Sequence, residues 1–107
     1  MLGVPDIDAI RSLCNRMLRA NWLEGVRESD RVPFAYTRPS PQRYPWQWFW
    51  DSCFAAIGWR HFDSGRSRAE LETLLSAQRP DGFIGHTIFW RGGPTGVRRF
   101  TYNVLSR

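Results

Sequence analysis

The sequence predicts an all-α fold made of helical hairpins joined by long loops that are rich in aromatic residues. Apolar residues recur at helical spacing in three segments, at about residues 6–22, 48–62 and 67–78. The segments between them contain prolines, glycines and aromatic clusters without sustained alternation of apolar and polar residues. With 107 residues, the chain is long enough for one small hydrophobic core.

The first helix is predicted over about residues 6–22. Asp6 follows Pro5 and is the expected N-cap, because a short carboxylate side chain accepts hydrogen bonds from the free backbone N–H groups of the first turn. Six apolar residues share one face of this helix: Ile7, Ile10, Leu13, Cys14, Met17 and Leu18. Arg11, Arg16 and Arg19 lie on the other face, where we expect them to be solvated.

Residues 24–44 are predicted to form a long loop. The helical periodicity is lost there, and Pro33, Pro39 and Pro41 break helices and remove backbone donors. Connections of this length are uncommon in compact domains unless they have a function. We therefore expect this loop to carry side chains to the rim of a binding pocket.

A second helix is predicted over about residues 48–62, with small residues that permit close approach of a neighbouring helix. The third helix is expected to start at Ser67, which forms a capping box with Glu70. Residues 79–82 (Arg-Pro-Asp-Gly) predict a turn. Residues 83–90 form either a short strand or an irregular buried segment, and residues 91–107 form a basic tail without a pattern typical of a packed helix.

Composition limits the classes of function. The net charge of +5 comes from fifteen arginines with no lysine, which leaves a basic nucleic-acid-binding protein as an alternative that we do not favour. Cys14 and Cys53 are too few and too far apart for a zinc cluster or a disulfide framework, and we expect no metal and no cofactor. No signal peptide or membrane span is indicated, so we expect a cytoplasmic protein with no membrane partner.

The most informative segment runs from Tyr44 to Phe54, where four aromatic residues fall between Trp46 and Trp50. A pyranose ring has apolar C–H faces and a rim of hydroxyl groups, so it is bound by flat aromatic side chains beside short polar groups. Trp48, Trp50 and Asp51 supply both kinds of group. The alternatives are that the tryptophans belong to the core and that Asp51 caps a helix.

Three runs of residues then carry a resemblance: residues 48–54 (WFWDSCF), 78–82 (QRPDG) and 86–90 (HTIFW). Over about residues 6–90 the chain resembles the early part of the mannosylglycerate hydrolase-like and related glucosidase enzymes of glycoside hydrolase family 63. This resemblance implies a partial (α/α)6 barrel, an incomplete toroid, over residues 1–90. It also implies sugar-binding roles for five residues: Tyr44, Trp48, Trp50, Asp51 and His86.

The resemblance further implies an inverting hydrolase acting on an α-linked glucoside or mannoside. Such an enzyme needs a general acid and a general base on either side of the glycosidic bond. In that family both carboxylates lie in later parts of the barrel, so we expect no catalytic residue here and no activity of the chain alone. The missing remainder of the barrel is then a possible partner, and a non-catalytic helical module that binds carbohydrate or another protein remains the alternative.

Overall fold

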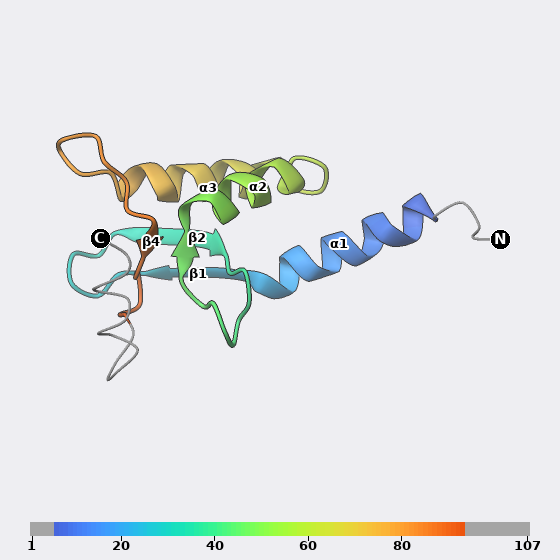
Figure 1. Cartoon of the computed structure of the whole chain (residues 1–107), viewed down its shortest axis with the longest axis horizontal. Coiled ribbons are helices and arrows are strands. Elements are labelled where there is room, and N and C mark those ends of the chain that lie inside the picture. Colours follow the sequence, from blue (N-terminus) through green and yellow to red (C-terminus); the bar gives the residue numbers. More distant parts are fainter. Residues whose placement is uncertain (1–5, 94–107) are drawn as a thin grey trace.

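The computed structural model describes residues 6–93, and this part contains both helices and strands (Figure 1). The helices are α1 (Ile7–Asn21), α2 (Phe49–Trp59) and α3 (Ser64–Ser76). The strands are β1 (Trp22–Val26), β2 (Pro33–Thr37), β3 (Gln47–Trp48) and β4 (Thr87–Ile88). They form two antiparallel two-stranded sheets, β1 with β2 and β3 with β4. The predicted all-α partial (α/α)6 barrel is therefore wrong for the part of the chain that is described.

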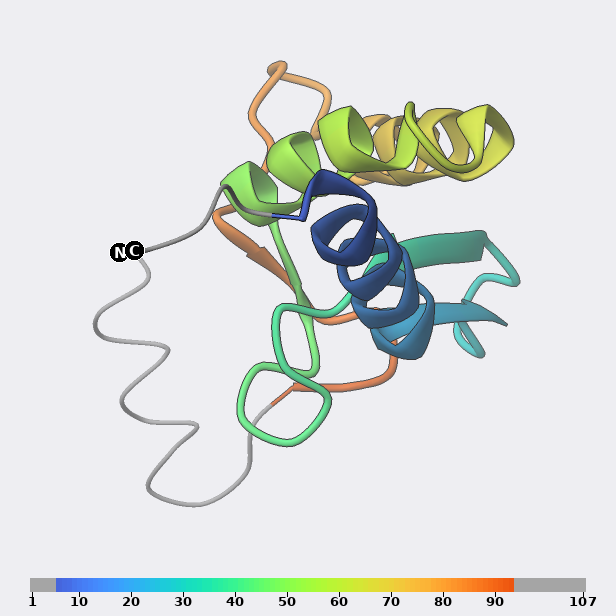
Figure 2. The same ribbon diagram turned by 90° about the vertical axis from the view of Figure 1, so that its right-hand side faces the viewer.

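Helix α1 confirms the first predicted helix closely. The Asp6 side chain accepts a hydrogen bond from the Ala9 backbone N–H at 3.0 Å, as the N-cap prediction requires. The helix extends away from the rest of the described chain and leads directly into β1 (Figures 1 and 2). Most of its apolar face is consequently exposed, including Ile7 at 67% and Leu13 at 58%.

The β1–β2 hairpin replaces residues 24–37 of the long loop predicted over residues 24–44, and residues 38–44 lie in no helix or named strand. The register pairs Trp22 with Thr37 and Val26 with Pro33. Pro33 is accommodated because it is the first residue of β2, where a missing N–H is tolerated. The turn contains no glycine, and Arg31 adopts the positive φ of 61° there. Arg27 and Asp30 form an ion pair across the turn at 2.6 Å.

Helix α3 covers the free edge of β2. The backbone N–H of Ala35 donates to Thr73 Oγ1 at 3.0 Å, and the N–H of Thr37 donates to the carboxylate of Glu70 at 2.9 and 3.0 Å. Residues three apart on a helix thus meet residues two apart on a strand. The predicted capping box is wrong, because α3 begins at Ser64 with Asp63 as its N-cap and Glu70 lies in its interior.

The core joins the hairpin, α3 and β4. Its buried members are Phe34, Tyr36, Leu74, Ile88 and Trp90. The rings of Phe34 and Trp90 stack with their centroids 5.7 Å apart. Helices α2 and α3 lie together along the β2 edge of the hairpin in Figure 1, which places the second and third predicted helices in one layer.

The segment after α3 follows the predicted turn and then forms β4. The N–H of Gly82 donates to the carbonyl of Arg79 at 2.9 Å, as expected for a turn at residues 79–82. The strand in the segment 83–90 is only Thr87–Ile88. Of the predicted tail, residues 94–107 lie outside the described residues.

Candidate functional site

The short β3–β4 pair brings together the two segments that carry the predicted site. Gln47 pairs with Ile88 and Trp48 with Thr87. The backbone N–H of Phe49 also donates to the carbonyl of His86 at 3.0 Å. The chain from Tyr44 to the start of α2 therefore lies beside the chain that follows His86, although about forty residues separate them in the sequence.

The side chains of the five predicted site residues differ in exposure. Trp48 is buried and contacts Tyr44 edge-to-face, with ring centroids 5.6 Å apart. Tyr44 and His86 are exposed. Trp50 is 64% exposed and contacts Phe54 one turn later on α2. These residues line none of the cavities of about 480, 830 and 410 Å³ found along residues 6–93.

Asp51 lies half-buried in the first turn of α2. The N-cap of this helix is Trp48, which makes no side-chain capping bond. The alternative that Asp51 caps the helix is therefore not observed.

Below this surface lies a buried polar cluster that the sequence analysis did not identify, which we call the Glu70 network. Its members are Thr37, Gln47, Ser52, Trp59, Glu70 and Trp90. Each of them is almost completely shielded from solvent. The network consists of two arms that both end on the carboxylate of Glu70.

The first arm begins at Trp59, whose indole N–H can only donate a hydrogen bond. Trp59 Nε1 donates to Thr37 Oγ1 at 2.8 Å, so the hydroxyl hydrogen of Thr37 is left to be donated to Glu70 Oε2 at 2.6 Å. The Thr37 backbone N–H donates to the same carboxylate. This arm joins β2, α2 and α3.

The second arm begins at Trp90, which donates to Gln47 Oε1 at 2.8 Å. With its oxygen facing the indole, Gln47 presents Nε2 to Ser52 Oγ at 3.0 Å. Ser52 then donates its single hydroxyl hydrogen to Glu70 Oε1 at 2.8 Å. This arm joins β3 and the start of α2 to the chain that follows β4.

Every hydrogen bond of the two arms is thus directed toward Glu70. This arrangement suits the ionised carboxylate, which has only acceptor sites. Burial raises the pKa of Glu70, while the hydrogen bonds from Thr37 and Ser52 act in the opposite direction. None of the ion pairs within residues 6–93 involves Glu70, so neutral donors alone compensate its charge.

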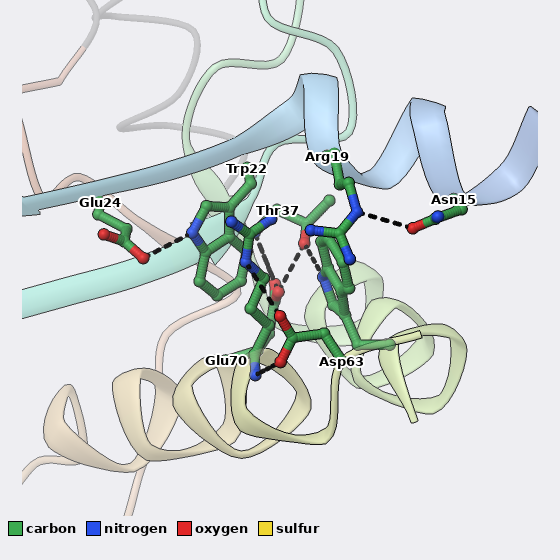
Figure 3. Close-up of polar contacts among 9 residues, drawn as sticks. Asn15, Arg19, Trp22, Glu24, Thr37, Asp63 and Glu70 are labelled. Atoms are coloured by element: carbon green, nitrogen blue, oxygen red, sulfur yellow. Dashed lines mark hydrogen bonds and ion pairs between the residues drawn. The ribbon is translucent and has the colours of Figure 1, made fainter. Parts of the chain in front are cut away.

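Arginine side chains surround the outer side of the first arm. The guanidinium of Arg66 lies 5.1 Å from the ring centroids of both Trp22 and Trp59, and that of Arg19 lies 5.5 Å from Trp59. Figure 3 shows Arg19 bonded to Asn15 and the Trp22 indole bonded to Glu24 beside Thr37. These arginines have partners inside the protein.

Within residues 6–93, no group of three or more His, Cys, Asp or Glu side chains is arranged to hold a metal ion. No helix of that part has both the length and the apolar character needed to cross a membrane.

Aromatic side chains and a carboxylate at the β3–α2 junction are the kinds of group with which a carbohydrate-binding protein contacts a pyranose ring. Comparison with known proteins agrees with this class. A family model described as the mannosylglycerate hydrolase MGH1-like glycoside hydrolase domain matches residues 44–104. The chain belongs to this family of glycoside hydrolases.

Individual relatives show the same similarity. The chain is 34% identical over 80 residues to mannosylglycerate hydrolase MGH1 of Selaginella moellendorffii, covering 73% of this chain and 16% of the relative. It is 45% identical over 56 residues to the glucosylglycerate hydrolase of Mycolicibacterium hassiacum, covering 52% of this chain and 13% of that enzyme. The chain therefore spans only 16% and 13% of the length of these two curated relatives.

A solved structure is also similar. It is the crystal structure of the family 63 mannosylglycerate hydrolase from Thermus thermophilus in complex with Tris and D-glycerate. The TM-score is 0.63 at 33% sequence identity, covering 78% of this chain and 18% of that chain. The resemblance to family 63 inferred from the sequence is thus confirmed.

Proposed function

We propose that residues 1–90 supply one part of a glycosidase domain that binds an α-linked glucoside or mannoside. The sugar-binding surface consists of Tyr44, Trp48, Trp50, Asp51 and His86. The observation that carries this proposal is the pairing of β3 with β4, because it brings the segment with Trp48 and Asp51 next to His86. Relatives named mannosylglycerate hydrolase and glucosylglycerate hydrolase suggest a hexose linked to glycerate as the ligand.

The surface has the chemistry that a sugar requires. Trp50 offers a flat, largely exposed face for the apolar side of a pyranose ring. The Asp51 carboxylate accepts hydrogen bonds from two adjacent hydroxyl groups. Trp48 is buried and packs edge-to-face against the exposed ring of Tyr44, so Trp48 holds Tyr44 in its position on the surface.

We assign no catalytic residue. Hydrolysis with inversion needs two carboxylates separated by roughly 6.5–9.5 Å with the sugar and a water between them. All ten acidic residues of the chain lie within residues 6–93. Glu70 is inaccessible to a substrate because it is completely buried. Most of the others already have roles as helix caps or in ion pairs: Asp6, Asp30, Asp63, Glu72 and Asp81.

A module that binds another polypeptide is the second candidate function. The observation that favours it is the large apolar area left uncovered on α1 and α2, including Leu13, Phe54 and Ile57. The occupant we propose is the remainder of a glycosidase domain, since the chain covers only 18% of the similar solved structure. Arginines such as Arg27 and Arg68 form ion pairs with carboxylates of the protein, so they do not support the alternative of a nucleic-acid-binding protein.

Sugar binding is tested by titrating the 107-residue chain with mannosylglycerate and glucosylglycerate while tryptophan fluorescence is recorded. We expect a saturable change in the wild type and its loss in Asp51→Ala. Asp81→Ala is the matched control, because Asp81 is an exposed carboxylate in the turn after α3. No response to either compound, or an equal response in Asp51→Ala, contradicts the proposed site. Release of hexose by the purified chain contradicts the absence of catalytic residues.

A further inference from the structure

We propose that the Glu70 carboxylate positions the sugar-binding surface by setting the direction of the hydrogen bonds beneath it. This inference rests on the proposed function and adds a residue that does not touch the sugar. Glu70 acts through Gln47 and Ser52, which are the direct neighbours of Trp48 and Asp51 in the sequence.

The second arm of the network reaches both halves of the surface. Gln47 and Ser52 are each fully buried and are bonded to each other at 3.0 Å. Successive side chains of a strand point to opposite faces, so an inward Gln47 fixes the face that Trp48 presents. Ser52 likewise fixes the rotation of the first turn of α2, on which Asp51 is carried.

The direction of the hydrogen bonds depends on Glu70 being an acceptor at both oxygens. A glutamine at position 70 replaces one oxygen with an NH2 group. If this group takes the place of Oε1 and faces Ser52, it also faces the Thr37 backbone N–H, and two donors meet. The serine oxygen accepts from the new NH2 group, and the only acceptor left in this arm for the serine hydroxyl hydrogen is the Gln47 amide oxygen. The Gln47 amide then turns its NH2 toward the indole N–H of Trp90, and two donors face each other.

The opposite orientation of the new amide is also unfavourable. Its NH2 group then faces the hydroxyl of Thr37, which already accepts from Trp59. It also faces the Thr37 backbone N–H, which can only donate. Glu70→Gln therefore disturbs one arm or the other, although its volume is almost unchanged.

A double variant that moves the carboxylate from position 70 to position 47 distinguishes the effect of hydrogen-bond direction from that of side-chain packing. In Gln47→Glu with Glu70→Gln, the new carboxylate at position 47 accepts from Trp90 and from the Ser52 hydroxyl. Ser52 accepts from the new amide at position 70, whose oxygen still accepts from Thr37. Every bond of the second arm is retained, with the bonds through Ser52 reversed, and the net charge is unchanged. The Thr37 backbone N–H keeps its bond to the oxygen at the Oε2 position and loses only the one to Oε1.

The test uses the full 107-residue chain labelled with ¹⁵N, and the probe ligand is mannosylglycerate. The indole N–H resonance of Trp90 reports the network, and tryptophan fluorescence reports affinity. We expect Glu70→Gln to shift the Trp90 resonance and to weaken binding about tenfold, which corresponds to one lost hydrogen bond. The double variant should restore the resonance and bring affinity back to within about threefold. Glu72→Gln, on the exposed face of the same helix, should change neither.

Two results overturn the proposal. One is an unchanged Trp90 resonance and affinity in Glu70→Gln, and the other is a double variant no better than the single variant. If Glu70→Gln fails to fold, the Trp90 resonance and the affinity of the double variant are compared with those of the wild type. A double variant that folds and binds within about threefold of the wild type supports the proposal, and one that does not overturns it. If the wild type binds no hexosylglycerate, the proposed function fails, while the Trp90 resonance still shows whether Glu70 sets the direction of the network.

Discussion

Three threonines with different hydrogen-bonding states provide the most direct test of the buried polar interactions. Thr37 Oγ1 accepts from Trp59 and donates to Glu70, and Thr73 Oγ1 accepts from the Ala35 N–H. The buried Thr87 Oγ1 has no partner within the described residues. Threonine and valine have nearly the same shape, so replacement with valine at each position mainly removes the hydroxyl group. We expect Thr37→Val to destabilise the protein most, Thr73→Val less, and Thr87→Val little or not at all.

The magnitudes follow from the groups left without partners. Thr37→Val leaves the buried indole N–H of Trp59 without an acceptor, at a cost of about 1–3 kcal/mol. It also removes a charge-assisted hydrogen bond to Glu70 that contributes about 1.5–3 kcal/mol. Because the Thr37 backbone N–H still donates to both carboxylate oxygens, we expect a total loss of about 3 kcal/mol. Thr73→Val leaves one backbone N–H without its acceptor, for a loss of about 1 kcal/mol. Thr87→Val removes a buried hydroxyl without a partner, so the change lies between zero and a gain of about 1 kcal/mol.

The assay is urea unfolding followed by far-UV circular dichroism, which does not depend on the tryptophans in the network. With a slope of about 1–3 kcal/mol/M, a loss of about 3 kcal/mol lowers the midpoint by about 1–3 M. The three variants are compared at equal slope. Equal losses at all three positions, or a loss at Thr87 as large as that at Thr37, would refute the assignment of the network.

Three further predictions concern packing, pH and surface. Gly25→Ala should lower the free energy of unfolding by about 1–3 kcal/mol, because the new Cβ would lie 2.5 Å from Cζ of buried Phe34; thermal melting checks this. Burial raises the pKa of Tyr36 to about 12, so its contribution to stability is full below pH ~10 and is lost as the pH rises toward ~12. Urea titrations across that range should show a fall of up to about 3 kcal/mol that Tyr36→Phe abolishes. Phe54 and Ile57, exposed at 67% and 57%, should promote self-association and binding of hydrophobic dyes, and Phe54→Glu should reduce both in sedimentation and fluorescence measurements.

The helices could be predicted from the sequence because their signals are local. The spacing of apolar residues and the Asp6 cap define α1 within a residue or two. The β1–β2 hairpin could not be found in the same way, because its turn lacks the glycine or Asn-Gly pair typical of short hairpins. Arg31 instead adopts a positive φ of 61° there. The buried alternation of Phe34 and Tyr36 was the available signal, and the nearby prolines obscured it.

Glu70 shows why the buried polar cluster could not be predicted from the sequence. Ser67 and Glu70 have the spacing of a capping box, and only the start of α3 at Ser64 excludes that role. Its partner Thr37 lies 33 residues earlier in the sequence, in a segment predicted to be a loop. A contact of that kind leaves no periodic pattern. The aromatic surface around Trp48, in contrast, is concentrated in one short segment and is visible as composition.

The energetics of a buried charge also bear on what the Glu70 network contributes. A carboxylate that is removed from water without a cation loses solvation energy, and hydrogen bonds from neutral donors recover it only when the geometry is good. Apolar residues of similar size often stabilise a core as well or better. Stability alone is therefore a weak explanation for this network. Its arms join the hairpin, both ends of α2 and the β3–β4 pair to one residue of α3. Because hydrogen bonds are directional, they can hold those elements in a single orientation where apolar contacts would permit several.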